Sequence, residues 1–564
     1  MASAPAHWRL LVPKLITTLR QGYGLRSFQA DAIAGLTVAI VALPLAMALA
    51  IASGTTPDKG LFTAIVAGFL ISALGGSRFQ IGGPTGAFVV IVFTVIQQHG
   101  YDGLVLATLM AGVILVVAGL AGLGSWIKYI PEPVVVGFTS GIALIIFSSQ
   151  IKDLFGLEIP AASAGVWEAW SANWAARATA SAPSMAIAFG ALATILLIRR
   201  FAPRLPGFLV AVVGASLAVY LLDLPTATIG SRFGGIPNSL PVPALPTITA
   251  ARLAELTPSA FTIAFLAGIE SLLSAVVADG MTGGRHRSNC ELVAQGVANA
   301  ASALFGGMPA TGAIARTATN VRTGARSPVS GMLHAVFLLA FMAFLAPLAV
   351  FVPLASLAAV LVVVAWNMSE IDHVRHLLKA PAGDRLVLIL TFALTVLVDL
   401  TIAIGVGVVF ASLLFMHRMA EAMTIDADKS SILTEDQDDF TRPDSDRGAQ
   451  RADLPADVEV FKFRGPFFFG AARKLTDVLD GIGRRPRAII LRLGESPLMD
   501  ASGAGALTGF LQHCEASGVA VILCEVTAQP RALLDRMGVI SGQVGVRLVA
   551  SYAEALALSN APAR

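Results

Sequence analysis

Apolar runs of membrane-spanning length fill most of the chain between residues 32 and 420. A transmembrane helix needs about 20 mainly apolar residues. The pattern predicts fourteen spans, at residues 32–52, 58–75, 84–98, 103–123, 132–150, 181–198, 206–222, 259–279, 291–305, 312–321, 328–348, 353–367, 384–399 and 401–417. The runs at 84–98 and 312–321 are too short to cross a bilayer alone, so we expect both to be half-helices.

The two short runs begin at similar motifs. Gly83-Pro84-Thr85-Gly86-Ala87-Phe88 matches Pro309-Ala310-Thr311-Gly312-Ala313-Ile314 at an offset of 226 residues, and the same offset places the apolar segment 35–54 over 261–280. Paired hydrophobic segments broken by Gly or Pro in two halves of a chain indicate the binding site of a transporter. The pattern therefore predicts a membrane transporter with two repeats, at about 31–222 and 259–417.

Composition supports a membrane environment and excludes several other functions. The chain is 55% hydrophobic and 13% charged, whereas soluble domains carry about 25% charged residues. A net charge of +3 gives no reason to expect a nucleic-acid partner. The three cysteines have neither CxxC spacing nor a histidine cluster, so we expect no disulfide and no metal. Without a nucleophile–base pair or nucleotide loop, we expect neither an enzyme nor a cofactor.

Basic residues predict the orientation of the spans. If residues 1–30 form a cytosolic segment, the inner flanks and loops hold seventeen Lys and Arg residues, and the outer loops hold five: Lys59, Lys152, Arg177, Arg232 and Arg252. Cytoplasmic loops of membrane proteins carry such an excess of positive charge. The bias supports fourteen crossings with both termini in the cytoplasm. We expect no removable signal peptide, because a small-residue cleavage site is lacking.

The composition changes after residue 420. Residues 424–457 contain ten acidic and four basic side chains, so we expect a flexible acidic linker over 421–457. From residue 458 to 564 a small α/β domain is predicted, because apolar strands alternate with helical stretches. The strands are expected at 458–463, 487–493 and 519–524, and the helices near 471–482, 502–515 and 528–537.

The two broken motifs are the candidate binding site. A half-helix exposes unpaired N–H groups and partial positive charge at its N-terminus, so two such ends facing each other would bind an anion. The small residues would let a ligand approach the backbone amides. The candidates are Thr85, Gly86, Ala87 and Phe88 in the first motif and Gly312, Ala313 and Ile314 in the second. The alternative is that these small residues serve tight helix packing.

Charged residues inside predicted spans add to this site. Arg316 lies about one turn into the second half-helix and would give the site a full positive charge. Glu270 lies in the middle of its span, where desolvation favours a protonated carboxyl that could exchange a proton during transport. Ser274, one turn further on, could share its hydrogen bonding. The alternatives are a structural salt bridge between Arg316 and Glu270, or a permanently protonated Glu270 in a helix–helix hydrogen bond. Glu291 is interpreted as an interface residue.

These residues resemble the sulfate permease (SulP) family of anion transporters over nearly the whole chain. The segments that carry the resemblance are DAIAGLTVAIVALPLAMALA (31–50), SRFQIGGPTGAF (77–88), GFTSGIA (137–143), ESLLSAVVADGMTG (270–283), ELVAQGVAN (291–299) and GAIARTATNVRTGARSP (312–328). The C-terminal domain is similar to the STAS domain of that family. The resemblance implies a helical membrane protein of seven-plus-seven inverted repeats, a core domain that moves against a gate domain, and a homodimer. It places the anion between the third and tenth spans.

Within the family, the runs 270–283 and VAWNMSE (364–370) resemble bacterial transporters of four-carbon dicarboxylates. Many members have a Glu after the Pro of the first span, and that Glu is proposed as their proton site. This chain has Leu45 there, which shifts the proton role to Glu270. In sodium-dependent members a Thr stands where this chain has Ile314, so a proton is favoured over sodium. The turn at 500–503 reads Asp-Ala-Ser-Gly and lacks one hydroxyl of the phosphorylated switch of similar domains. The STAS domain is therefore interpreted as a folding and dimer-stabilising module that could bind a cytosolic protein.

The sequence thus predicts a secondary active transporter in the bacterial inner membrane. We expect proton-coupled uptake of succinate, fumarate or aspartate by an elevator-like alternating-access mechanism. The alternatives are a sulfate or bicarbonate transporter of the same family, a channel-like anion conductor, and a sensor that signals through its STAS domain.

Overall fold

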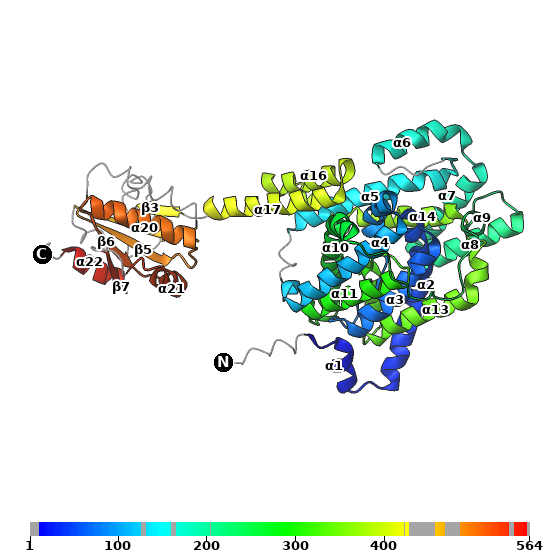
Figure 1. The fold of residues 1–564 in the computed structure, drawn as a ribbon, viewed down its shortest axis with the longest axis horizontal. Helices are drawn as coiled ribbons and strands as arrows, with labels where there is room; N and C mark the ends of the chain where they lie inside the picture. Colours follow the sequence, from blue (N-terminus) through cyan, green and yellow to red (C-terminus); the bar gives the residue numbers. More distant parts are fainter. Residues whose placement is uncertain are drawn as a thin grey trace. The chain divides into compact units, whose positions relative to one another are not determined.

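The computed structural model describes residues 11–125, 131–159, 165–203, 205–421, 424–427, 457–468, 486–540 and 546–560. The chain divides into two compact units, Met1–Ala411 and Ser412–Arg564 (Figure 1). The expected helix at 471–482 and most of the expected linker lie outside the described residues.

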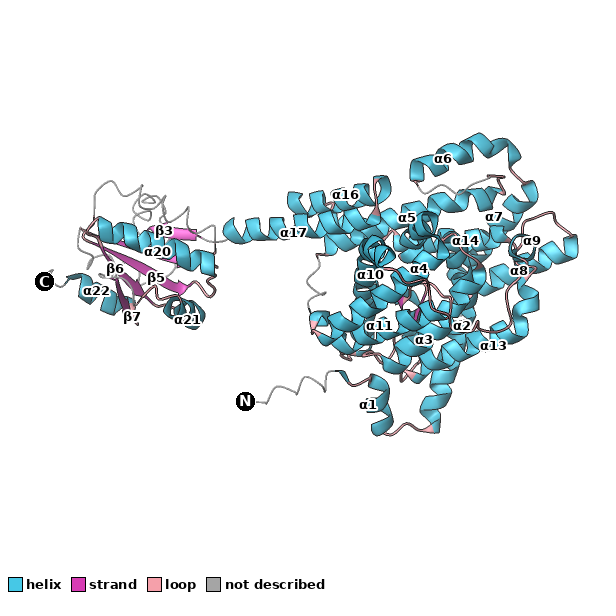
Figure 2. Cartoon of the chain, in the orientation of Figure 1, coloured by secondary structure: helices cyan, strands magenta, loops and turns pink. Residues whose placement is uncertain are grey.

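The first unit is almost wholly helical (Figure 2). Its helices are α1 (Lys14–Arg20), α2 (Leu25–Ala52), α3 (Pro57–Leu74), α4 (Phe88–Leu120), α5 (Glu132–Phe155), α6 (Val166–Ala175), α7 (Ala182–Phe201), α8 (Gly207–Leu222), α9 (Ile229–Phe233), α10 (Ala250–Thr282), α11 (Ser288–Leu304), α12 (Ile314–Arg322), α13 (Val329–Ala349), α14 (Leu354–Met368), α15 (Ile371–Leu377), α16 (Ala382–Leu397) and α17 (Leu400–Glu421), the last of which runs past Ala411. Short 3-10 turns follow α4 and α6, at Leu123–Ser125 and Ala176–Thr179.

Each of the fourteen predicted spans overlaps one of these helices. The third and fourth spans share α4, in which Gly100 breaks the helix with a left-handed φ of 69°. Within the described residues, nine helices are long and apolar enough to cross a membrane. The amphipathic helix α6 was not predicted, because its ten residues lie outside any long apolar run.

The helices pack as two groups. Helices α2, α3, α4, α10, α11, α12 and α13 contact one another extensively and are called the core bundle here, while α5, α7, α8, α14 and α16 form the gate bundle. Helices α4 and α11 of the core bundle approach each other closely. A Cβ on Gly112 would lie 2.7 Å from the carbonyl oxygen of Gly296, and a Cβ on Gly296 would lie 2.5 Å from that of Gly112. Small residues allow this close contact, as in other membrane helix pairs.

Two very short strands join the halves of the core bundle. Strand β1 (Gly82–Gly83) pairs antiparallel with β2 (Thr311–Gly312), with Gly82 opposite Gly312. The backbone N–H of Ala313 also donates to the carbonyl of Ile81 at 2.8 Å. The strands immediately precede the two half-helices, so this pairing brings the repeated motifs together.

The second unit contains a five-stranded sheet in the order β3-β4-β5-β6-β7. The strands are β3 (Thr424–Ala427), β4 (Val458–Arg464), β5 (Ala488–Glu495), β6 (Ala520–Cys524) and β7 (Val546–Val549), and only the β3–β4 pair is antiparallel. The helices described in this unit are α20 (Ala501–Ala516), α21 (Ala528–Arg536) and α22 (Tyr552–Asn560).

Alternating strand residues build a core on each face of the sheet. Phe463, Leu491 and Leu523 pack with Leu507 of α20 on one face, and a second cluster packs with Tyr552 of α22 on the other. The three predicted strands and the two predicted helices within the described residues are all present. Residues Thr424–Ala427 form β3 in this sheet, although the sequence placed them in the acidic linker. Strand β7 was not predicted.

Candidate anion-binding site

The starts of α4 and α12 are built alike. Each follows an alanine N-cap, Ala87 and Ala313, and neither cap makes a side-chain hydrogen bond. The first amides of a helix have no intrahelical partner, and the helix dipole places partial positive charge there. In α4 the first turn tightens, because the N–H of Phe88 reaches the carbonyl of Thr85 at 3.3 Å. The arrangement has the features of a site for negative charge.

Arg316 lies at the junction of the two motifs. Its side chain is 3% exposed, and Nη2 donates to the carbonyl oxygen of Pro84. A Cβ on Gly83 would lie 2.7 Å from Nη1, so glycine at this position makes room for the guanidinium. Among the described residues, Nε and Nη1 have no hydrogen-bond partner. A salt bridge from Arg316 to Glu270 was one of the alternatives drawn from the sequence. In the structure Arg316 lies against the backbone of the first motif instead.

Glu270 connects α10 to the first motif. Its Oε2 accepts a hydrogen bond from the Thr85 hydroxyl at 2.9 Å. Ser274, which was expected to share hydrogen bonding with Glu270, donates instead to Thr317 Oγ1 at 3.0 Å. Thr317 in turn accepts from the N–H of Ile81 at 3.0 Å. Thr317 therefore links α12 both to α10, through Ser274, and to Ile81 just before β1. Thr85 is the partner of the carboxyl group.

A buried polar network behind the motifs was missed by the sequence analysis. The amide of Gln80 donates to Ser271 Oγ at 2.6 Å, and Ser271 donates to Glu291 Oε1 at 3.3 Å. Glu291 Oε2 also accepts from the backbone N–H of Gly76 at 2.9 Å. A Cβ on Gly312 would lie 1.8 Å from Gln80 Nε2. Glu291, interpreted as an interface residue, is thus fully buried and anchors the loop that leads into β1.

The gate bundle covers part of the first motif. A Cβ on Gly86 would lie 2.4 Å from the sulfur of Met368 in α14 and 3.4 Å from Cδ1 of Ile146 in α5. Ala87 and Phe88 are fully buried, so their side chains do not line an open surface. Ile314, by contrast, keeps 38% of its surface exposed at the start of α12.

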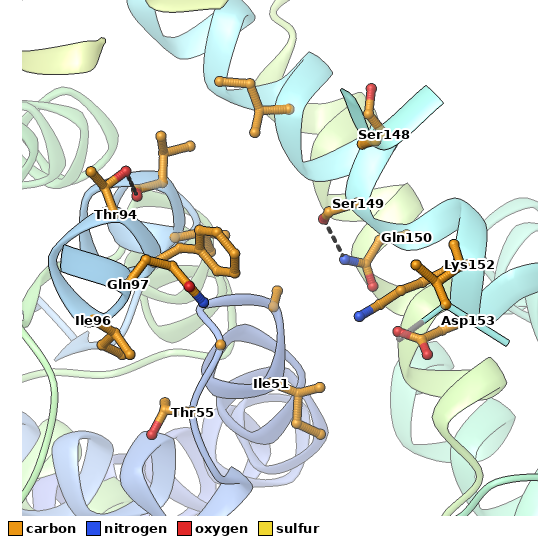
Figure 3. Close-up of a pocket in the computed structure, with 18 of the residues that line it drawn as sticks. Ile51, Thr55, Thr94, Ile96, Gln97, Ser148, Ser149, Gln150, Lys152 and Asp153 are labelled. Carbon is orange, nitrogen blue, oxygen red and sulfur yellow. Dashed lines mark hydrogen bonds between the residues drawn. The ribbon is translucent and has the colours of Figure 1, made fainter. Parts of the chain in front are cut away.

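A cavity of about 530 Å³ begins beside this site. It is lined by Val89 and Val90, in the first turn of α4, and by Ile145 of α5. It continues between α4 and α5 toward Lys152 (Figure 3). The first turn of α4 therefore forms part of the wall of this cavity.

Comparison with known proteins identifies the family. The model of the sulfate permease family matches residues 28–391, and that of the STAS domain matches residues 451–555. The chain belongs to the sulfate permease family. It is 41% identical to "Putative sulfate transporter YvdB" of Bacillus subtilis (strain 168) over 520 residues, which cover 92% of this chain and 95% of the relative. It is 29% identical over 522 residues to the bicarbonate transporter BicA of Picosynechococcus sp. (strain ATCC 27264 / PCC 7002 / PR-6), with 91% of each chain covered.

Solved structures agree with this assignment. The transmembrane domain of a cyanobacterial bicarbonate transporter BicA has a TM-score of 0.61 and 32% identity, and covers 68% of this chain and 98% of that one. The murine anion transporter Slc26a9 in its inward-facing state has a TM-score of 0.85 over 99% of this chain and 95% of that one, at 18% identity. The second likeness shows the fold alone.

These findings establish the coarse function of this sulfate permease family member. The chain is a multi-pass helical membrane protein that transports anions, and it carries a C-terminal STAS domain. It is a transporter and not an enzyme, as predicted.

Proposed function

We propose that this transporter takes up C4-dicarboxylates such as succinate, fumarate and aspartate together with a proton. The observation that carries the proposal is the hydrogen bond of 2.9 Å between Thr85 and Glu270, which joins an acid to the start of the first half-helix. A proton acceptor and a site for negative charge therefore share one location. Movement of the core bundle past the gate bundle would then carry both across the membrane.

Charge balance links the proton to the anion. Two helix N-termini contribute about half a positive charge each, and Arg316 contributes one more. A dianion matches this total of about two positive charges only when Glu270 is neutral. Because the unpaired Nε and Nη1 of Arg316 are buried donors, pairing with an anion would recover part of their desolvation cost.

Side chains near the site favour an organic anion. Ile314 is partly exposed at the start of α12, and Met368 covers Gly86 with its thioether. Sulfate presents oxygen in every direction, so apolar walls would leave some of its oxygens unpaired. A C4-dicarboxylate has carbon between its two carboxylates and could place it against such walls.

The sequence at the site supports a proton over sodium as the coupling ion. In sodium-dependent members the ion is bound by an acid, a hydroxyl four residues later and a Gly-Ala-Thr stretch. Glu270, Ser274, Gly312 and Ala313 fit this pattern, and the chain departs from it at Ile314. Ile314 supplies no oxygen where that pattern has a Thr.

Sulfate or bicarbonate is the second candidate substrate, favoured by the names of the relatives. Backbone N–H groups and one arginine donate hydrogen bonds to the oxygens of any of these anions. The proposal includes a homodimer in the bacterial inner membrane with both termini in the cytoplasm. The STAS domain would stabilise the dimer and could bind a cytosolic protein.

Uptake into proteoliposomes tests the proposal. Labelled succinate should accumulate against its gradient when the outside is acidic, and fumarate and aspartate should compete more strongly than sulfate or bicarbonate. The variant Glu270→Gln should lose stimulation by the acid gradient. Glu255→Gln is the matched control, because Glu255 lies on the same helix with 61% of its side chain exposed. Unchanged acid-driven uptake by Glu270→Gln would refute the coupling role, and stronger competition by sulfate or bicarbonate would refute the dicarboxylate.

A further inference from the structure

The cavity beside the candidate site carries polar side chains on two facing walls, among apolar ones (Figure 3). One wall is made by α4 and the loop after α2 in the core bundle, and it includes Thr55, Thr94 and Gln97. The facing wall, on α5 of the gate bundle, includes Gln150 and Lys152. By the predicted orientation, these residues lie near the outer end of their spans. The cavity would therefore be the vestibule through which an external anion reaches the half-helices.

The charges lining this vestibule are mostly neutralised. Lys59 pairs with Asp58 at 3.6 Å, and Arg232 pairs with Asp153 at 3.4 Å. Lys152, the third lining cation, has no ion-pair partner in the part of the chain that the structure describes. One positive charge therefore remains without a counterion in the vestibule.

Neutral hydrogen-bonding groups lie around this charge. In Figure 3, Lys152 and Gln150 project from α5 into the space that faces Gln97 of α4. The Gln150 amide donates to Ser149 Oγ at 2.8 Å, and both residues line the cavity. An ammonium group beside amide donors suits the oxygens of a carboxylate or sulfate.

We propose that Lys152, with Gln150 and Gln97, forms an anion-capture site that holds a small dianion before it enters the transport site. The inference rests on the proposed function in that the captured ligand is the transported anion. A cleft with one sign of charge raises the local concentration of its ligand and the rate of association. Lys152 would then determine how fast a dilute anion loads, while the transport site sets the maximal rate.

The first test is kinetic. At low ionic strength, Lys152→Gln should lower kcat/KM for a dianion by about tenfold, within the range of electrostatic steering, and leave kcat unchanged. Added salt should slow the wild type and hardly affect the variant, because salt screens the charge. Lys379→Gln is the control, since Lys379 is an exposed lysine on the other side of the predicted membrane. Equal kcat/KM and equal salt dependence for Lys152→Gln and wild type would overturn the proposal.

The second test measures capture without transport. The chain's three cysteines, at positions 290, 514 and 524, are buried, so Lys152→Cys offers one accessible thiol for a methanethiosulfonate reagent. Succinate or sulfate should slow labelling of this thiol. A cationic adduct should restore loading and an anionic adduct should not. If wild type transports neither anion, the proposed function fails, but slowed labelling still supports the capture site. Labelling that neither anion slows would overturn it.

Discussion

Gly312 offers a direct test of how the two repeats are held together. It pairs with Gly82 across the β1–β2 contact, and a Cβ added there would lie 1.8 Å from Gln80 Nε2. Gln80 is 4% exposed and its amide is held by Ser271 at 2.6 Å, so it has little room to move. We therefore expect Gly312→Ala to displace Gln80 and disrupt the network behind the site.

The cost follows from two contributions. A buried polar group left unpaired costs about 1–3 kcal/mol, and an overpacked core costs about 1–3 kcal/mol more. The lower total is about 2 kcal/mol. A cost of this size corresponds to a fall of roughly 30-fold in the equilibrium constant between the native arrangement of the two motifs and a disrupted one. Gly312→Ala should therefore lower uptake at least tenfold.

Uptake per reconstituted protein and thermal stability in detergent are the assays. Gly190→Ala is the control, because Gly190 has open space around its missing Cβ. Adding Gln80→Ala removes the clashing side chain, so the double variant should lose less activity than the two single losses combined. If Gly312→Ala transports within twofold of wild type and keeps its stability, the structural role assigned to the Gly312–Gln80 contact is wrong.

Three further predictions concern the site and the STAS domain. Gly86→Ala should lower uptake because its Cβ would lie 2.4 Å from the Met368 sulfur, and adding Met368→Ala should restore it; no rescue would argue against this contact. Thr85→Val removes the hydrogen bond to Glu270, which is neutral in the loaded state, so the bond is worth about 0.5–1.5 kcal/mol and uptake should fall about 2- to 10-fold. Thr108→Val is its control, because that buried hydroxyl donates to the Leu104 carbonyl within α4 at 2.7 Å, and equal uptake by the two variants would refute the role of Thr85. Burial raises the pKa of the Cys524 thiol to about 12, so it should stay neutral and unreactive toward a thiol reagent from pH 7 to 9 until the STAS domain unfolds; rapid labelling of the folded domain would contradict this.

The helices could be predicted because each long apolar run has few other ways to satisfy its backbone in a membrane. The internal repeat also indicated the two short helical segments, which are the part of α4 before Gly100 and α12, and that their starts would meet. The structure adds the β1–β2 pairing that brings them together. It also shows that Arg316 lies against Pro84 and not against Glu270.

The supporting contacts could not be predicted from local patterns. Gln80 and Ser271 are 191 residues apart, and Gly76 and Glu291 are 215 residues apart, so only the folded core bundle brings them together. The short strand β3 could not be predicted, because it lies at the start of a segment rich in acidic residues. Substrate identity lies beyond the sequence pattern, because backbone amides bind many anions alike.

A structure determined with a bound anion tests the central claim most directly. We predict density for succinate between the starts of α4 and α12, within hydrogen-bonding distance of backbone N–H groups near Ala87 and Ile314 and close to Arg316 and Glu270. Anion density confined to another part of the protein, with the start of α4 still covered by Met368, would contradict the account.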